Sequence, residues 1–487
     1  QRRRSFWMAA VAPFLEPLLR TLHSQDGLDA GLPTFGVRAG TLNLCKAVLG
    51  AGLLSLPRAF SLLGAGFSTL AYLLVSVLTI FTLGHGMVIP SASARGTQLE
   101  HGSYAGLARH FLGPFAEQGL AFMVVMGCLG FQTSYLDIIS DLLFGSYHRP
   151  EEGLLSAPFP TADRNLVLGL IVLLVLLPLG LHRHMGNLSM MNGVGLVSMA
   201  VFATTLLALA VTAMWTGQAY NLPLTPNLEA LGSRPLLQGL GGFHVLSVLL
   251  TSCGCHQNMH PLMDEVEPFS TRTLQLIIRN TVAITTTFYY VASVCACIAF
   301  GPHISDDILT NLTVPSMQPI VGEATATVLA AAVKWGFLLN ICGSVVLTLF
   351  PMRQALADLL TGSQGAPPII DDGPLALSVE HASVIIGPGL HARTWREKAH
   401  APMTVGILGL AYLLAASFPS IWMVLSLVGS VSVTFVCWIT PSMIALSKMR
   451  QGEQGGLWHS SAKLLCWAIA ALGAAVFVNG FVVLYFH

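Results

Sequence analysis

The sequence has few charged residues. Asp, Glu, Lys and Arg make up 9% of its 487 residues, whereas soluble globular domains carry roughly 25%. Hydrophobic residues reach 54%, so polar residues are too few to coat several water-facing domains, and the chain must use lipid as part of its solvent. Because 23 basic residues balance 23 acidic ones, no basic excess points to a nucleic-acid partner.

Signals of catalysis and of metal binding are also missing. All nine cysteines lie inside apolar stretches, which argues against a framework of exported disulfides. The runs Cys253-Gly254-Cys255-His256 and Cys295-Ala296-Cys297 lack the usual spacing of zinc ligands. No paired carboxylates, Ser/His set or metal cluster stands at one predicted face. We therefore expect no enzyme activity, no transition metal and no cofactor beyond a coupling ion.

Eleven stretches are apolar and long enough to cross a bilayer, for which a helix needs about 20 residues. They lie near 38–60, 67–90, 118–144, 165–181, 188–215, 236–262, 274–300, 324–350, 402–417, 419–446 and 464–486. The ninth is short and only Pro419 separates it from the tenth, so ten or twelve spans are the alternatives. The sequence thus predicts an all-α integral membrane protein with about eleven transmembrane helices.

The basic residues place the amino terminus in the cytosol, because cytosolic connections carry an excess of Lys and Arg. With residues 1–37 as a cytosolic or interfacial tail, seventeen basic residues fall inside and four outside, while Lys46 and Lys334 lie within helices. This orientation puts the sequon Asn311-Leu312-Thr313 outside, where glycosylation can occur.

The longest connection, 352–401, is rich in Pro, Gly and charge. We interpret it as a mobile cytosolic loop, either a contact site for a regulatory partner or a tolerated insertion.

Two of the predicted spans contain the same irregularity. The first has Gly50-Ala51-Gly52 and then Pro57, and the sixth has Cys253-Gly254-Cys255 and then Pro261. Each proline follows its glycine, Gly50 or Gly254, by seven residues. Because five spans separate the pair, the two helices cross in opposite directions, which is typical of an inverted repeat with broken helices at the bilayer midplane. Glycines that merely allow close helix packing are the alternative.

The residues around the first break resemble a known family. The run NLCKAVLGAGLLSLP, from Asn43 to Pro57, resembles the first-helix signature of the amino acid/auxin permease family, which includes sodium-coupled neutral amino acid transporters and vacuolar amino acid transporters. Further matches follow in the family's order: Gly102-Ser103-Tyr104, Ser134-Tyr135-Leu136, Cys255-His256-Gln257-Asn258, Phe350-Pro351-Met352-Arg353 and Leu427-Val428-Gly429-Ser430. The resemblance covers roughly 38–353 and 402–445. It implies a LeuT-like 5+5 inverted repeat with broken helices 1 and 6, a ten-helix core over 38–446, and an eleventh helix within 447–487.

Broken helices expose main-chain groups that can bind a zwitterion. Unpaired amides near Leu53 attract a carboxylate, and unpaired carbonyls near Lys46 to Leu49 attract a cation. The predicted substrate-binding residues are Gly50, Ala51, Gly52, Leu53, Thr251, Ser252 and Cys253. An amino acid is then recognised without a buried charged side chain, which avoids a cost of about 2.5–3.5 kcal/mol or more at mid-bilayer.

A coupling ion needs ligands of its own. Asn340, Ser344 and Thr348 form one polar line in the eighth span, although such hydroxyls also bond their own helix. By resemblance, Ser344 and Asn43 occupy positions that relatives use for sodium. The predicted ion-coupling residues are Asn43, Lys46, Leu49, Ser344 and His256, of which Lys46 departs from the family pattern and His256 is the candidate for proton coupling.

The sequence therefore predicts a secondary transporter of small neutral amino acids that works by alternating access and is coupled to sodium or protons. A membrane amino acid sensor with little net flux is the alternative. The plasma membrane and a vacuolar or lysosomal membrane both fit.

Overall fold

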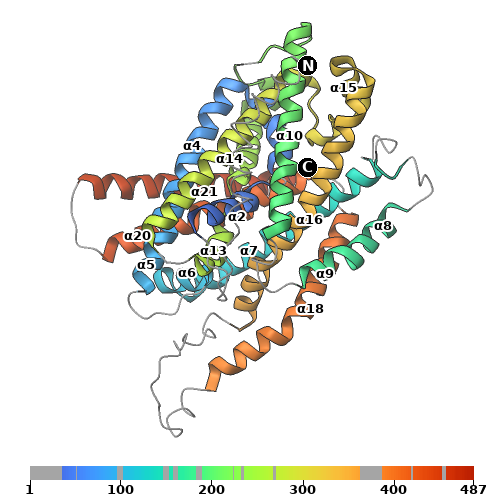
Figure 1. Cartoon of the computed structure of the whole chain (residues 1–487). Coiled ribbons are helices and arrows are strands. Elements are labelled where there is room, and N and C mark those ends of the chain that lie inside the picture. Colours follow the sequence, from blue (N-terminus) through green and yellow to red (C-terminus); the bar gives the residue numbers. More distant parts are fainter. Residues whose placement is uncertain are drawn as a thin grey trace.

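The described residues of this computed structural model are 36–486 except 51, 96–102, 146–152, 157–162, 182–188, 223, 232–234, 267–269, 362–386, 418–420 and 452–456. They form helices joined by connections, with no strand in this part of the chain (Figure 1). Residues 1–35 of the predicted tail over 1–37 lie outside the described residues.

All eleven predicted apolar runs are helical. In chain order the elements are α2 (Val37–Val48) with α3 (Gly52–Leu63), α4 (Ala65–Leu83), α7 (Pro114–Phe144), α8 (Arg164–Ile171) with α9 (Leu177–Gly180), α10 (Ser189–Thr216), α12 (Pro235–Ser252) with α13 (Met259–Glu265), α14 (Thr271–Phe300), α16 (Glu323–Thr361), α18 (Gly387–Ser417), α19 (Ile421–Leu427) with α20 (Thr440–Gln451), and α21 (Leu457–Phe486). By length and hydropathy, eight helices of the described part can each cross a membrane, and α2 with α3 makes a ninth as a bent pair.

Shorter elements connect these helices. Four π-helical turns join helices of the same run. η1 (Gly84–Val88) joins α4 to α5 (Ile89–Arg95), and η3 (Val172–Leu176) joins α8 to α9. η9 (Val428–Val433) and η10 (Phe435–Ile439) lie between α19 and α20. The other short elements are α6 (Tyr104–Leu112), α11 (Leu228–Leu231), η5 (His256–Asn258), η6 (Gly301–His303), η7 (Ile308–Thr310) and α15 (Val314–Val321).

Both predicted helix breaks are present. The first run stops being helical after Val48 and resumes at Gly52, and the sixth stops after Ser252 and resumes with η5 at His256. The physical reason is local, because glycine costs about 1 kcal/mol per residue in a helix interior.

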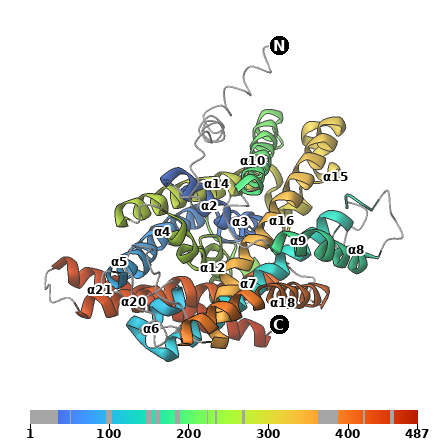
Figure 2. The same ribbon diagram turned by 60° about the horizontal axis from the view of Figure 1, so that its bottom comes forward.

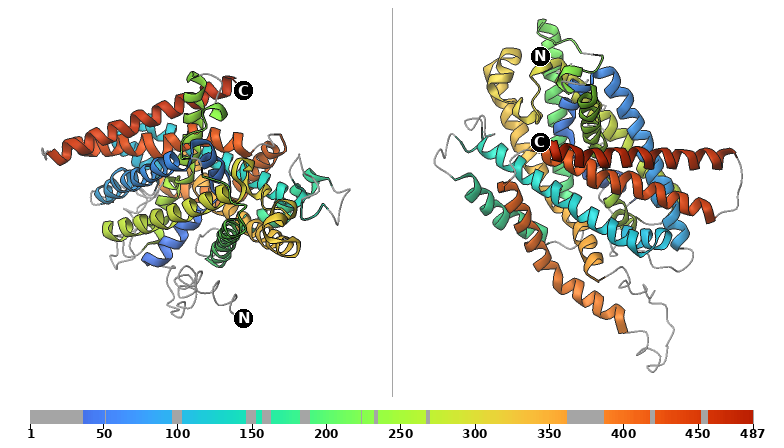
Figure 3. Two further views of the ribbon diagram at one scale, coloured as in Figure 1. Left: turned by 90° about the horizontal axis from the view of Figure 1, so that it is seen from above. Right: turned by 180° about the vertical axis from the view of Figure 1, so that it is seen from behind.

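The broken helix α2–α3 lies at the centre of the molecule. Figure 2 shows α2 and α3 surrounded by α12, α14 and α16, and the same helices pack against them. α7 packs along α16, and α20 and α21 run side by side across the bundle (Figure 3). The arrangement therefore places the first break inside the protein, away from lipid.

The connection over 352–401 is shorter than the sequence predicts. α16 continues to Thr361, and α18 begins at Gly387, so only 362–386 lies outside the described residues. Arg353 anchors this extension of α16, because its guanidinium donates to Gly180 O at 2.7 Å and to Thr404 Oγ1 at 3.1 Å. These bonds tie the extension to α9 and α18. Contact with a regulatory partner stays a prediction.

The Asn311 sequon is not an open acceptor site in the folded chain. Asn311 is only 7% exposed. Its Nδ2 donates to His303 O at 2.8 Å, and its Oδ1 accepts from the Ser305 amide at 2.8 Å. Both amide atoms close the loop between α14 and α15, and a glycan on Nδ2 would displace its bond to His303 O. Glycosylation of this sequon stays a prediction that the fold does not favour.

Candidate functional site

The first break brings two glycines against neighbouring helices. α2 and α3 meet at an angle of 63°. A Cβ atom on Gly50 would lie 2.6 Å from Tyr135 Oη of α7, and one on Gly52 would lie 3.0 Å from the Cα of Ser252 in α12. Both distances are shorter than the contact of about 3.5–4.0 Å that carbon atoms prefer, so glycine is what permits this approach. The predicted Ala51 lies outside the described residues.

A tyrosine hydroxyl holds the end of α2. Tyr289 Oη of α14 donates to Val48 O at 2.6 Å, and the same carbonyl accepts the Gly50 amide at 2.8 Å. The Leu53 amide donates to Gly50 O at 3.2 Å, so the prediction of an unpaired amide at Leu53 is wrong, because the break closes on itself in a tight turn. The role of the Leu49 carbonyl as a cation ligand stays a prediction.

The second break ends α12 in a tightened turn. The amides of Cys253 and Gly254 donate to carbonyls three residues earlier, at 3.2 and 3.1 Å, which is a common way to end a helix. The hydroxyls of Thr251 and Ser252 donate to carbonyls of their own helix at 2.8 and 2.7 Å. Their side chains therefore stabilise the break, while substrate contact by their main chain stays a prediction.

Buried hydroxyls without partners surround the start of α3. Ser55 Oγ and Ser293 Oγ have no hydrogen-bond partner within the described residues. Tyr72 of α4 lies beside Cys253 at the end of α12, and Ser293 lies one turn after Tyr289 on α14, which packs against α3. An unsatisfied buried polar group costs about 1–3 kcal/mol. This cost falls if a polar ligand or water reaches these groups.

The predicted ion-coupling residues meet in part. The buried Lys46 ammonium donates to Asn340 Oδ1 at 2.6 Å, to Asn340 O at 3.1 Å and to Ser344 Oγ at 2.7 Å. Ser344 Oγ in turn donates to Asn340 O at 3.1 Å, and a part for Asn43 in ion coupling stays a prediction. Thr348 Oγ1 donates to Ser344 O at 2.8 Å, as expected of a hydroxyl that serves its own helix.

Two further titratable residues are buried away from this contact. His256 is fully buried, and its Nε2 lies 2.9 Å from Thr82 Oγ1. Asp137 of α7 is 2% exposed, and its Oδ2 has no hydrogen-bond partner in the described part. One turn further along, Asp141 pairs with Arg164. Proton coupling through His256 stays a prediction.

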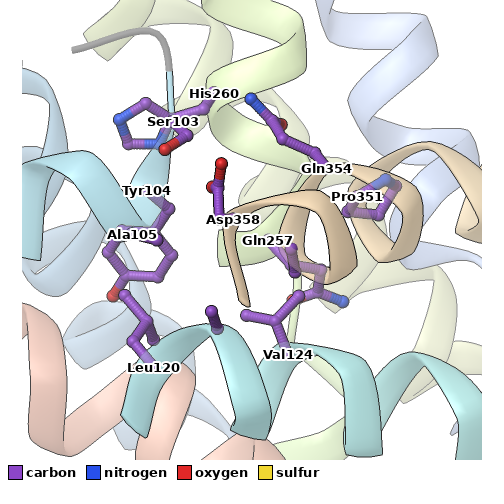
Figure 4. Close-up of a pocket in the computed structure, with 12 residues that line it drawn as sticks. Ser103, Tyr104, Ala105, Leu120, Val124, Gln257, His260, Pro351, Gln354 and Asp358 are labelled. Atoms are coloured by element: carbon purple, nitrogen blue, oxygen red, sulfur yellow. The ribbon is translucent and has the colours of Figure 1, made fainter. Parts of the chain in front are cut away.

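Small cavities run from the predicted cytosolic end toward the first break. Figure 4 shows a cavity of about 20 Å³ into which Asp358 points, with Tyr104 and His260 on one side and Gln257 below. The Tyr104 and His260 rings stack with centroids 5.6 Å apart. A cavity needs about 10–15 Å³ to hold one water, so this space admits water but not an amino acid.

A second cavity continues the line toward the break. Its volume is about 10 Å³, and it shares Val124 and Gln257 with the first. It also touches Phe131, whose ring stacks on that of Tyr135 with centroids 6.4 Å apart. The Tyr135 hydroxyl lies over Gly50, so the Phe131–Tyr135 pair stands between this cavity and the first break.

The opposite end of the bundle has a polar cavity of about 20 Å³ lined by Asp141, Asp307, Leu309 and Lys334, among others. Asp307 lies between α14 and α15, outside the helices that cross the bilayer. Burial raises the pKa of the Asp307 carboxyl to about 7, and the nearby Asp141 and Asp306 reinforce this rise. The hydrogen bond that the carboxyl accepts from the Leu309 amide acts in the opposite direction. This cavity is also too small for an amino acid.

Tyr72, Tyr135 and Tyr289 are not among the site residues that the sequence predicts. The signal that points to them is a phenol inside an apolar helix, because a buried tyrosine hydroxyl usually finds a polar partner. All three are buried at the ends of the two breaks.

Sequence comparisons identify proteins to which this chain is similar. A family model described as transmembrane amino acid transporter protein matches residues 33–486. Amino acid transporter AVT6C of Arabidopsis thaliana is 24% identical over 457 residues, covering 92% of this chain and 94% of that protein. Vacuolar amino acid transporter 5 of Schizosaccharomyces pombe is 24% identical over 424 residues, covering 86% of each.

One solved structure shares the fold over nearly the whole chain. It is a Na+-coupled sialic acid symporter in a substrate-bound outward-open state, with a TM-score of 0.51, 11% identity, and coverage of 98% of this chain and 97% of that one. At this identity the likeness shows the fold alone. It supports the LeuT-like inverted repeat.

Proposed function

Because this chain belongs to the transmembrane amino acid transporter family, we propose that it carries small neutral amino acids across a membrane by alternating access. The first break supports this proposal most directly. It combines two glycines in close contact with α7 and α12, a carbonyl end at α2, and unpaired hydroxyls at the start of α3. Such a site suits a small zwitterion, because α2 ends and α3 begins at the break and their helix dipoles present opposite poles to a carboxylate and an ammonium.

A neutral side chain follows from the charges at the two breaks. Over the described positions of 43–55 and 250–258, Lys46 is the one Asp, Glu, Lys or Arg residue. Its ammonium is already bound to α16. An acidic or basic substrate side chain would therefore lose its hydration without gaining a partner charge.

Alternating access requires two groups of helices that move against each other. We assign α2, α3, α4, α12 and α14 to the moving bundle, and α7, α8, α9, α16 and α18 to the scaffold. The contact of Gly52 with Ser252 then lies within the bundle, whereas the contacts of Gly50 with Tyr135 and of Lys46 with α16 join bundle to scaffold. These last contacts must change when either side opens.

The membrane and the coupling ion belong to the same proposal. Relatives named vacuolar amino acid transporters favour a vacuolar or lysosomal membrane over the plasma membrane, with the amino terminus in the cytosol. A gradient of sodium or protons drives the transport.

Counterflow in proteoliposomes tests this function. Vesicles loaded with an unlabelled amino acid should accumulate the labelled one in a saturable way. The panel comprises alanine, serine and glutamine as neutral substrates, with glutamate and lysine as charged controls. Exchange confined to the neutral set is the expected result. Saturable binding without exchange would instead establish a sensor, and exchange of lysine or glutamate alone would refute the argument from charge.

A further inference from the structure

Lys46 is a charged side chain buried in the middle of a membrane helix. It is 1% exposed, and it lies two residues before the end of α2. No carboxylate of the described residues forms an ion pair with it. Charged groups at membrane depth are rare and usually functional, so this ammonium calls for a physical explanation.

The surroundings of the ammonium form a complete cation site. An ammonium has three N–H donors and no acceptor, and three oxygen atoms receive them: Asn340 Oδ1 at 2.6 Å, Ser344 Oγ at 2.7 Å and Asn340 O at 3.1 Å. Carbonyl and hydroxyl oxygens are also the ligands that hard metal cations prefer. Lys46 therefore occupies a cluster of oxygens that would otherwise suit a free cation.

Two features show that the site is built around the lysine. A Cβ on Gly195 of α10 would lie 2.7 Å from Lys46 Cε and 2.7 Å from Asn340 Oδ1, so this glycine makes room for the lysine stem. The Asn340 side chain turns its oxygen toward the ammonium, and its Nδ2 has no hydrogen-bond partner in the described part of the chain. The amide thus leaves a donor unpaired in order to present an acceptor to Lys46.

We infer that the Lys46 ammonium is a built-in cation that takes the place of a sodium ion between α2 and α16, so that transport by this protein does not use sodium. The inference rests on the proposed function and specifies its ion. A tethered ammonium cannot leave with the substrate, so this site carries no energy from a sodium gradient. Of the two coupling ions in the proposed function, the proton remains.

Few other titratable groups face the ammonium from the elements packed against α2. The Cys342 thiol of α16 interacts electrostatically with Lys46. α10 contributes Gly195 at this place, and α14 contributes Tyr289, whose hydroxyl donates a hydrogen bond to Val48 O. Lys46 is thus the dominant charge at this contact.

The first experiment compares the wild-type protein in sodium and in choline chloride. Counterflow of a neutral amino acid should run at the same rate in both salts, and sodium should not raise the melting temperature above that in choline. A severalfold faster exchange in sodium, or a melting temperature that rises with sodium concentration, would overturn the inference. If no amino acid is exchanged in either salt, the proposed function fails, while the melting temperatures still test the site.

The second experiment empties the site. Lys46→Ala leaves the oxygens of Asn340 and Ser344 without their cation, so sodium or methylammonium should now raise the melting temperature, because a ligand that binds only the folded state stabilises it. Lys46→Met, which keeps the volume of the stem, should show a smaller response. A Lys46→Ala protein that folds but whose melting temperature responds to neither cation would refute the cation site. If the variant does not fold, the comparison of the wild-type protein in sodium and in choline decides the question.

Discussion

The close contact between Gly52 and Ser252 makes the function of the first break directly testable. In Gly52→Ala the new methyl carbon would lie 3.0 Å from the Cα of Ser252, whereas carbon atoms prefer about 3.5–4.0 Å. The neighbour is main chain and cannot rotate away, so α3 and α12 must separate by about 0.5–1 Å. The two broken helices would then no longer meet in the geometry that holds the substrate.

The structure allows the size of this effect to be worked out. Adding a methyl group to a well-packed contact costs about 1–3 kcal/mol, partly offset by about 1 kcal/mol because alanine favours a helix over glycine. The folded protein should therefore survive. A displacement of about 1 Å at a reacting site typically costs about 100-fold in rate, and we expect exchange to fall by about 10- to 100-fold.

Counterflow and thermal unfolding measured on the same preparation check this expectation. Gly406→Ala is the matched control, because the position lies in α18 with nothing within 4 Å of the new methyl. This variant should exchange like the wild type and unfold at the same or a slightly higher temperature. Undiminished exchange in Gly52→Ala would show that the contact of the two breaks does not shape the site. A loss shared by both variants would trace to handling rather than to the site.

Three further expectations concern single contacts. Tyr289→Phe removes the hydrogen bond to Val48 O. Counterflow should fall severalfold, and the free energy of unfolding should fall by about 0.5–1.5 kcal/mol. Unchanged exchange would show that Tyr289 only packs against its neighbours. The pKa of the Asp307 carboxyl rises from 3.8 to about 7 on folding, so between these values the unfolded chain is ionised while the folded chain still holds the proton. Stability should therefore fall as the pH rises from 4 to 7 and then level off. Asp307→Asn should remove this part of the pH dependence of the melting temperature, and an identical slope in the variant would contradict the argument. Asn311→Ala deletes both loop-closing bonds and should lower the melting temperature. Glycosidase should leave the electrophoretic mobility of the wild-type chain unchanged, and a shift in mobility would contradict this expectation.

Much of the architecture could be predicted because it depends on local sequence. The apolar runs require only a count of residues against bilayer thickness, and both breaks follow from glycines inside such runs. The bounds of the connection over 352–401 were too wide, because α16 continues to Thr361 and α18 begins at Gly387, and Arg353 anchors the extension of α16 to two other helices. Nothing within that stretch reveals these partners.

The site was predicted less completely. Gly50 and Gly52 lie at the first break as predicted, and Ser344 faces α2, where it accepts a hydrogen bond from Lys46. The Leu53 amide is paired, since the direction of a main-chain group in a break depends on a turn that residue types do not specify. Asn311 was interpreted from a motif, although its burial decides whether the motif can be used.

What the sequence determined by itself is the solvent, the helices and the positions of their interruptions, because hydropathy and glycine act over a few neighbouring residues. The tertiary structure alone decided which groups fill the space at those interruptions. Lys46 and Asn340 are 294 residues apart, and Tyr289 and Val48 are 241 apart. Such pairs meet only when whole helices pack, since the packing of the bundle and not the local chain sets the distance between their atoms.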